Sequence, residues 1–361
     1  MEIQIIVYLL VLFFLLMAIS IDKGYLFQIK QQSLSLKKLD LSLIIAAKNE
    51  EENIPSLFES LEKINYPVEN YEVIFVDDNS TDKTNELISE LIKTKQNYKL
   101  IKADSKRFEG KKGALQIGIE NSKYKFIVIT DADCRPESNW LIEISGKLNA
   151  GFDFVFGVAP IKSGKNFIQK LAAFENFRNT YLTISAVGLN IPYSASARSF
   201  AFRKSSFERI GGYSKTTDTI SGDDDLLLRE AVKNKMLIGT LIDPEAFVYS
   251  NPPNSLANYL KQKKRHLKTS VHYLFKQKLF LGFWHIINII CLFSIVLIPV
   301  SINFVLPVAV KLIFDFYVAV KRQNELGHSF NLLQIIPLQI VFEIFLIINF
   351  INSLNGKVEW K

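Results

Sequence analysis

The sequence predicts an α/β domain with a mostly parallel sheet and flanking helices, joined to about four transmembrane helices. Apolar residues make up 48% of the 361-residue chain, and long apolar runs lie at its two ends. Between them, short apolar runs alternate with segments of helical periodicity, which is typical of a parallel sheet covered by helices. Three of the short runs stop abruptly at acidic or amide residues, where ligands bind in such sheets.

The N-terminal segment from Ile3 to Ile21 contains no charged residue. About 20 helical residues cross the core of a bilayer. Before this segment there is only Glu2 in place of the basic region of a cleaved signal peptide, and no small-x-small cleavage site follows. We therefore expect residues 1–21 to form an uncleaved transmembrane helix.

Apolar character returns in residues 279–354, where we expect a membrane region of two to three transmembrane helices. Three segments are the candidate spans: Leu281–Val300, Ile302–Val320 and Leu332–Leu354. Their helical pattern is interrupted by Pro299, Pro307 and Pro337. A re-entrant or interfacial helix in place of one span is the open alternative.

Basic residues next to the spans indicate the orientation: Lys23, Lys30, Lys37, Lys38, Lys321 and Arg322. With four spans they all share the side of the central domain, and the positive-inside rule makes that side cytoplasmic. Cys134 and Cys291 are the two cysteines of the chain and imply no disulfide framework. We expect a multi-pass protein of the cell membrane with a cytoplasmic domain.

The net charge of +7 favours contact with anionic membrane lipids rather than nucleic acid, because the basic residues cluster beside the apolar segments. Seven of them lie in Lys261–Lys278, which contains no acidic residue. Lipid contact is the preferred interpretation of this segment. Gln262, Arg265 and His266 within it are candidates for holding a pyrophosphate leaving group or the acceptor.

Four strands are expected in the central region: Leu41–Ala47, Tyr71–Val76, Tyr98–Lys102 and Phe126–Thr130. Helical spacing between them predicts helices over Glu51–Ile64, Thr81–Lys93 and Lys111–Asn121. The segment Asn166–Ser199 carries aromatic and amide residues that the pattern does not place.

Asp131 and Asp133 directly follow the last of these strands. Mg²⁺ and Mn²⁺ prefer hard oxygen ligands and commonly take one or two carboxylates together with substrate phosphates. Two carboxylates on a turn at the end of a strand suit one ion and a nucleotide together. A structural Asx-turn or a helix cap is the alternative.

Asp77 and Asp78 end another strand, and one of them is expected to contact the base or ribose of a nucleotide. Ser80 or Thr81 would cap the helix that follows, and Asp82 would complement its dipole.

The segment Gly110–Gly113 opens a helix and contains Lys111. A lysine near a helix N-terminus suits a phosphate, and a solvated basic turn is the alternative.

Three further aspartates, Asp223, Asp224 and Asp225, precede an apolar run that continues as a helix. Neighbouring negative charges raise one another's pKa, which suits a general base that works near neutrality. An acidic first helical turn is the alternative. In the C-terminal spans, Asp315 and Glu343 are costly in hydrocarbon, and Lys311 lies at the right spacing to neutralise Asp315.

Taken in order, these motifs resemble family 2 glycosyltransferases with a GT-A fold, over about Leu41 to His272. The resemblance rests on Ile45–Glu51, Val76–Asp82, Gly110-Lys111, Thr130–Asp133, Phe202-Arg203, Ile210–Tyr213 and the aspartates before Leu226. It implies a Rossmann-like cytosolic glycosyltransferase domain over residues 40–272. Residues 40–134 would be its nucleotide-binding half and residues 135–272 its acceptor half.

The resemblance also implies roles on the donor side. Ala47 and Glu50 would line the nucleotide, with Asp77 or Asp78 near the base. Lys111 would approach the nucleotide or its phosphates.

For the reaction itself, Asp131 would face the ribose or phosphate, and Asp133 would ligate Mg²⁺ or Mn²⁺. Asp223 would be the catalytic base, with Asp224 as the second candidate. The family often has glutamate before the base, where Gly222 stands here.

A Q-x-x-R-W element of processive family members appears here as Gln262-x-x-Arg265-His266. A tryptophan that stacks on an acceptor sugar is thus replaced by a smaller ring. We expect an inverting enzyme that moves one sugar from a nucleotide sugar, preferably a UDP-sugar, to a hydroxyl of a lipid-linked, glycan or other membrane-proximal acceptor.

Three alternatives remain: a processive polysaccharide synthase, a membrane protein with a non-catalytic nucleotide-sensing domain, and a nucleotidyltransferase. The last is disfavoured because residues 46–53 contain no glycine, although nucleotidyl transfer needs a glycine-rich loop after the first strand.

Overall fold

The computed structural model describes residues 2–31 and 38–353, so that Lys37 and Leu354 lie outside the described residues. Its contacts divide the chain into two compact units. Among the described residues, 2–30, 163–192 and 253–353 form one of them, which we call the helical unit. Residues 31, 38–162 and 193–252 form the other, the sheet unit. The domain boundaries expected from the sequence stay predictions.

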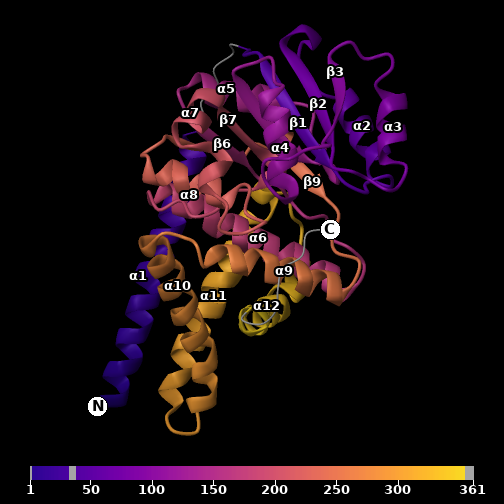
Figure 1. The fold of residues 1–361 in the computed structure, drawn as a ribbon. Coiled ribbons are helices and arrows are strands. Elements are labelled where there is room, and N and C mark those ends of the chain that lie inside the picture. Colours follow the sequence, from indigo (N-terminus) through magenta and orange to yellow (C-terminus); the bar gives the residue numbers. More distant parts are fainter. Residues whose placement is uncertain (1, 32–37, 354–361) are drawn as a thin grey trace. The chain divides into compact units, whose positions relative to one another are not determined.

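The helical unit consists of long helices that come from three parts of the chain (Figure 1). They are α1 (Glu2–Lys30), α6 (Phe167–Gly188), α9 (Leu256–Ser270), α10 (Phe275–Phe293), α11 (Val305–Arg322) and α12 (Leu332–Ser353). Short 3-10 turns extend α10 to Leu297 and start α11 at Ile302. Four segments of this unit are long and apolar enough to cross a membrane: Glu2–Lys30, Phe275–Leu297, Ile302–Arg322 and Leu332–Ser353.

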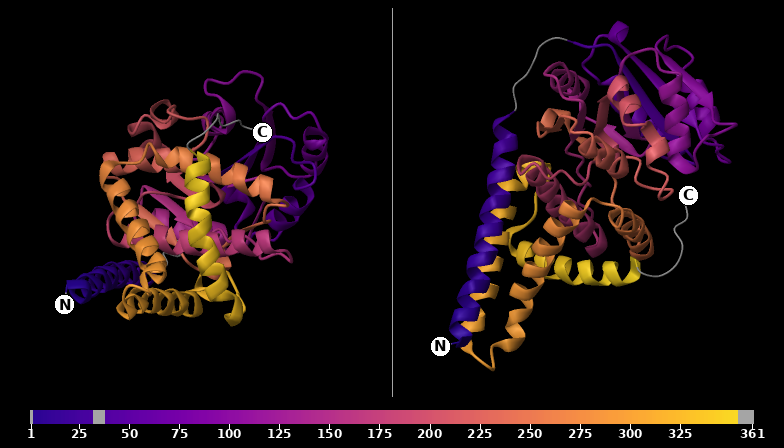
Figure 2. Two further views of the ribbon diagram at one scale, coloured as in Figure 1. Left: turned by 90° about the horizontal axis from the view of Figure 1, so that it is seen from below. Right: turned by 60° about the vertical axis from the view of Figure 1, so that its left-hand side comes forward.

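The direction of α12 differs from that of the other apolar helices. Figure 2 shows α10 and α11 as a hairpin that runs along α1, whereas α12 runs crosswise to them. The sequence left open whether an interfacial helix replaces one of the spans, and α12 is the helix whose direction suits that role.

The sheet unit is built on a seven-stranded sheet with the order β3-β2-β1-β4-β7-β6-β8. Its strands are β1 (Leu41–Ala47), β2 (Tyr71–Asp77), β3 (Tyr98–Lys102), β4 (Phe126–Asp131), β6 (Phe154–Gly157), β7 (Phe200–Arg203) and β8 (Ile238–Leu241). β7 is antiparallel to β4 and β6, and all other neighbours are parallel. Two shorter strands, β5 (Cys134–Pro136) and β9 (Val248–Ser250), pair separately. The predicted mostly parallel sheet is thus confirmed.

Helices cover both faces of this sheet. Alternate side chains of a strand point to opposite faces, so successive residues of β1 pack on different helices. Leu43 and Ile45 of β1 share a buried cluster with residues of α2 (Ile54–Glu62) and α5 (Trp140–Asn149). The intervening Ile44 faces α4 (Gly110–Glu120), where a Cβ on Gly118 would lie 2.4 Å from its Cγ2 atom. The remaining helices of the unit are α3 (Thr84–Leu91), α7 (Lys204–Arg209) and α8 (Asp225–Lys233).

The four predicted strands are present, and two of them are one residue longer at the carboxyl end, reaching Asp77 and Asp131. The helix predicted from Thr81 was wrong at its start, because α3 begins at Thr84 and its N-cap residue is Lys83. The side chain of Asp82, rather than Ser80 or Thr81, accepts a hydrogen bond from the Thr84 backbone amide at 3.0 Å. The segment that the sequence did not place, Asn166–Ser199, is mostly the long helix α6.

Candidate functional site

The carboxyl ends of three parallel strands bring the predicted donor residues to one edge of the sheet. In the register of β1 with its neighbours, Ala47 pairs with Asp77, and Ala46 pairs with Asp131. The backbone amide of Asp78 donates to the carbonyl of Ala47 at 2.8 Å. The predicted nucleotide contacts Ala47, Asp77 and Asp131 are therefore neighbours in space.

Lys111 joins this edge to the aspartate cluster that lies far along the sequence. Its Nζ atom lies 2.5 Å from Oδ1 of Asp131 and 2.7 Å from Oδ2 of Asp223. Burial alone would lower the pKa of the Lys111 ammonium, but the charges of the two carboxylates raise it well above its ordinary value. Burial would likewise raise the pKa of Asp223, and the Lys111 charge holds it below its ordinary value. The ammonium is thus part of an internal ionic bridge.

Asp133 has the chemistry and position for a divalent metal. Ligand atoms of Asp131, Asp133 and Cys134 lie within 4.8 Å of one another. Burial, followed by the charge of Asp133, raises the pKa of the Cys134 thiol, which keeps it protonated and a poor ligand for a hard ion. Two carboxylates remain, which is the number that Mg²⁺ or Mn²⁺ commonly takes from a protein when substrate phosphates complete its shell.

The two neighbouring aspartates at the end of β2, Asp77 and Asp78, differ in what they bind. Asp77 accepts a hydrogen bond from the Ser80 backbone amide at 3.2 Å and one from the Asn85 side chain at 3.0 Å. Asp78 pairs through Oδ1 with the ammonium of Lys106 at 2.5 Å, while its buried Oδ2 atom has no hydrogen-bond partner among the described residues. Asp77 therefore holds the local loop, and Asp78 has an acceptor to offer a ligand.

Glu50 lies in the loop after β1, and this loop is fastened to the loop after β2. The Glu50 backbone amide donates to Thr84 Oγ1 at 2.8 Å, and its carboxylate accepts from Asn53 at 2.7 Å. Asn49 accepts a hydrogen bond from the Thr81 backbone amide at 2.8 Å. These bonds fix the two loops beside the edge where the nucleotide contacts are expected.

Of the three aspartates at positions 223–225, Asp223 contacts Lys111, whereas Asp224 and Asp225 accept hydrogen bonds from backbone amides. Asp224 accepts from the backbone amides of Ala197 at 2.7 Å and Asp225 at 2.8 Å. Asp225 accepts from the Ser194 hydroxyl at 2.7 Å. Burial, followed by the charges of Asp225 and Asp223, raises the pKa of Asp224 well above its ordinary value. Of the two predicted bases, Asp223 is therefore the one whose carboxylate lies at the donor edge.

Gln262, Arg265 and His266 lie on α9 of the helical unit. Their spacing puts them on one face of that helix. Their assignment to a pyrophosphate or an acceptor stays a prediction.

The partner of Asp78 is a residue that the sequence did not indicate. Lys106 lies in the loop before α4, one of several basic residues there, and nothing in its immediate neighbourhood distinguishes it. The acidic pair at the end of β2 was a hint that a counter-charge was needed, but its identity follows from the fold.

Comparison with known proteins agrees with this geometry. Residues 42–211 match the sequence profile of the family described as Glycosyl transferase family 2. A beta-monoglucosyldiacylglycerol synthase of Nostoc sp. is 36% identical over 104 residues, which cover 29% of this chain and 22% of the relative. Glycosyltransferase AglE of Haloferax volcanii is 32% identical over 118 residues, which cover 32% of this chain and 38% of the relative. The chain thus spans less than half the length of these curated relatives.

Among solved structures, the mannosyltransferase PcManGT of Pyrobaculum calidifontis, in complex with GDP-Man and Mn²⁺, superposes with a TM-score of 0.55 at 16% identity. The match covers 96% of this chain and 99% of that one, and at this identity it shows the fold alone. The GT-A fold, the family profile and the order of the motifs agree, and residues 42–211 of the chain match a glycosyl transferase family 2 domain.

Proposed function

We propose that this protein is an inverting glycosyltransferase that moves a sugar from a nucleoside diphosphate sugar to a hydroxyl of a lipid-linked or membrane-proximal acceptor. The observation that carries the proposal is the meeting of Asp131, Lys111 and Asp223 at the edge that also presents Asp133. A donor site and a candidate base are thereby adjacent, as transfer to an acceptor hydroxyl requires.

The donor would bind along the ends of β1, β2 and β4. Asp78 offers its free Oδ2 to a donor group of the base or ribose, and Glu50 lines the neighbouring loop. Asp131 faces the ribose or the phosphates, and Asp133 holds Mg²⁺ or Mn²⁺. When bound, the metal offsets the charge of the departing nucleoside diphosphate. UDP is the favoured nucleotide, and the GDP-Man seen in PcManGT makes GDP the second one to test.

The acceptor would react from the side of Asp223. Its carboxylate takes the proton of the acceptor hydroxyl, and the oxygen attacks the anomeric carbon in line with the leaving nucleoside diphosphate. One attack from the opposite face inverts that carbon. Lys111 keeps Asp223 ionised and oriented, because the two groups share a buried ion pair.

The candidate membrane helices favour a lipid-linked acceptor. If α1, α10 and α11 cross the bilayer and α12 lies along it, the segments that form the sheet unit follow the Lys23 and Lys30 end of α1, on the cytoplasmic side. The name of the Nostoc relative, a glycolipid synthase, points to the same class of acceptor.

Calorimetry with UDP and Mn²⁺ on the purified full chain tests the donor site. We expect Asp133→Asn to lose the metal-dependent affinity while the thermal unfolding midpoint stays that of the wild type. Asp40→Asn is the matched control, because Asp40 precedes β1 at the opposite edge of the sheet and bonds to Asn70. Unchanged metal-dependent affinity in Asp133→Asn would remove the metal assignment.

Incubation of membranes with radiolabelled nucleotide sugars tests the reaction and the acceptor. Label that enters the lipid extract as a single added sugar supports the proposal. Label in a growing polymer would favour the processive alternative, and nucleotide binding without transfer of any sugar in the panel would favour a sensing domain.

A further inference from the structure

The interior of the helical unit contains a chain of ionic contacts between helices α6, α11 and α12. Arg178 Nη2 lies 2.7 Å from Asp315 Oδ1, and Lys311 Nζ lies 2.6 Å from Asp315 Oδ2. Lys311 also lies 2.9 Å from Glu343 Oε1. The sequence predicted the pairing of Asp315 with Lys311, which is confirmed, but not the contributions of Arg178 and Glu343. Charged groups inside apolar helices are costly unless paired, and they mark functional sites.

These contacts satisfy Asp315 but leave polar atoms unused beside it. Among the buried side-chain atoms that have no hydrogen-bond partner in the described residues are Arg178 Nη1, Glu343 Oε2 and Asn288 Oδ1. Their residues are 6%, 2% and 2% exposed, respectively. Buried polar atoms in folded proteins are nearly always bonded, so each of these atoms calls for a partner.

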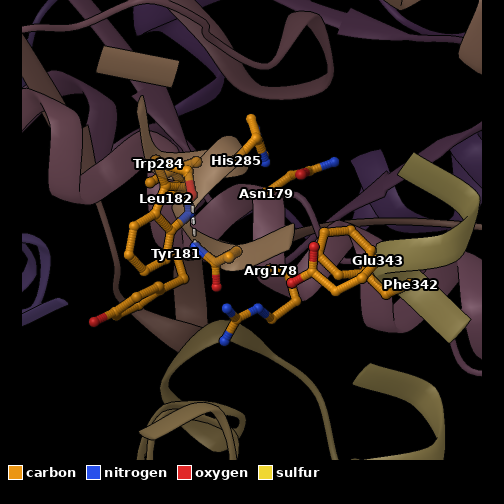
Figure 3. Close-up of a pocket in the computed structure, with 9 residues that line it drawn as sticks. Arg178, Asn179, Tyr181, Leu182, Trp284, His285, Phe342 and Glu343 are labelled. Carbon is orange, nitrogen blue, oxygen red and sulfur yellow. Dashed lines mark hydrogen bonds between the residues drawn. The ribbon is translucent and has the colours of Figure 1, made fainter. Parts of the chain in front are cut away.

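All three residues line one small, partly open pocket with a cavity volume of about 10 Å³, which is room for a single hydroxyl-sized group. Its lining comes from α6, α10 and α12 and includes the aromatic residues Tyr181, Trp284 and Phe342 beside these three polar residues. Figure 3 shows the labelled side chains gathered around this space, with polar groups beside aromatic rings. The described residues that line the pocket all belong to the helical unit.

The unused atoms define the chemistry of an occupant. Arg178 offers a donor, whereas Glu343 and Asn288 offer acceptors. A phosphate would meet the carboxylate of Glu343, and a cation would meet Arg178 and Lys311. A hydroxyl group both donates and accepts, so it satisfies a donor and an acceptor together.

We propose that this pocket binds the free hydroxyl of a neutral membrane lipid headgroup. The outer faces of the lining helices suit a lipid, because Phe283 and Ile286 on α10 are 53% and 57% exposed and Ile344 on α12 is 41% exposed. Acyl chains can lie against these side chains while the hydroxyl group alone enters between the helices. The site goes beyond the proposed transfer reaction, because it requires no sugar donor.

The test uses the full chain in phosphatidylcholine nanodiscs that contain a small fraction of dioleoylglycerol, with native mass spectrometry to count retained lipid. We expect selective retention of one dioleoylglycerol. Its 3-O-methyl ether, which has the same chains but no hydroxyl hydrogen, should be retained on the order of tenfold less, as expected for the loss of one or two hydrogen bonds. Free glycerol in place of the lipid should not compete, since the site needs the acyl chains.

Two asparagine variants provide a matched pair. Asn288→Leu removes a side-chain carbonyl that has no hydrogen-bond partner among the described residues and belongs to the pocket lining. Asn349→Leu removes an equally buried side-chain carbonyl on α12, which also has no such partner but does not belong to the pocket lining. We expect Asn288→Leu to lose the preference for dioleoylglycerol over its ether and Asn349→Leu to keep it. A folded Asn288→Leu protein that keeps the preference would overturn the proposal. Equal retention of alcohol and ether by the wild type would mean that the pocket holds water alone, with the same consequence.

Discussion

Lys111 Nζ lies 2.7 Å from the Oδ2 atom of Asp223, although the two residues belong to different motifs. Lys111 lies within the segment that matches the family profile, residues 42–211, whereas Asp223 lies beyond the end of that segment. The same ammonium contacts Asp131 at 2.5 Å. One buried cation therefore ties the proposed donor side to the proposed base. A metal bound to Asp131 or Asp133 would compete with this cation, so that Lys111 would be a positioning residue of the proposed site, and its contact with the nucleotide or its phosphates stays a prediction.

Lys111→Met should destabilise the protein and slow sugar transfer. The substitution leaves two partly or fully buried carboxylates without their counter-charge, a loss of about 3 kcal/mol for a buried pair. The thermal midpoint and the rate of transfer measure it, with the exposed Lys123→Met as control. If the bridge matters, Asp223→Asn added to Lys111→Met should recover part of the midpoint, and strictly additive effects would show that the two groups are uncoupled.

Substitutions of the two predicted bases should have different effects, that of Asp223 on the rate of transfer and that of Asp224 on stability. Asp223→Asn is expected to retain donor affinity and lose transfer by about 100-fold or more, as expected for loss of a general base. Asp224→Ala should instead lower the thermal midpoint, because it removes the acceptor for the backbone amides of Ala197 and Asp225. Donor calorimetry and initial rates on both variants separate the roles. Full turnover by Asp223→Asn would transfer the role of base to Asp224.

Substitutions of Asp77 and Asp78 should likewise have different effects, the first on stability and the second on the affinity for UDP. Asp78→Asn is expected to weaken UDP binding by about tenfold, since one free acceptor and one charge are lost. Asp77→Ala should cost about 1–2 kcal/mol of stability, because its contacts with Ser80 and Asn85 shape the loop. Titration with UDP at matched fractions of folded protein distinguishes them. Equal loss of UDP affinity in both variants would contradict the assignment to Asp78.

The donor edge could be predicted from the sequence because its signals are local. An apolar run followed at once by aspartate shows where a parallel strand ends, and such ends meet at one edge. The strands around β1 followed this pattern, and their register placed Asp77 and Asp131 beside Ala47 and Ala46.

The rest depends on contacts between distant residues. The strands β6, β7 and β8 have only four residues each, too few to show a period, and one of them reverses direction. The partner of Asp223 is in another motif, and the partner of Asp315 includes Arg178 on a helix that the sequence did not place. No local pattern encodes such pairs.

Acid should weaken the sheet unit through Glu72. Burial alone would raise the pKa of this carboxyl, but hydrogen bonds from the Ser42 hydroxyl and the Lys123 backbone amide, together with Lys99, hold it below its ordinary value. A lowered folded-state pKa contributes stability above the unfolded value, about 4.3, and this stability is lost as the pH falls through the folded value.

Glu72→Gln should therefore have a lower thermal midpoint than the wild type at pH 7, and the difference should shrink below about pH 4. Midpoints measured between neutral and acid pH check this. Glu59→Gln is the control, because its pair with Lys63 is exposed and screened by solvent. A difference between Glu72→Gln and wild type that does not change with pH would show that packing, not ionisation, sets the effect.

The crossing of α1 and α6 should be the most sensitive contact of the helical unit to a single methyl group. A Cβ on Gly188 would lie 1.9 Å from the backbone oxygen of Gly24, which leaves the two helices no room unless they separate. Small residues at such a crossing allow the close approach of helix backbones. Gly188→Ala is expected to lower the thermal midpoint of the detergent-purified protein by several degrees, for a loss of about 1–3 kcal/mol from overpacking. Gly282→Ala on α10 is the matched control, since its added methyl group would meet nothing within 4 Å. Equal midpoints for the two variants would mean that α1 does not pack on α6 at Gly188.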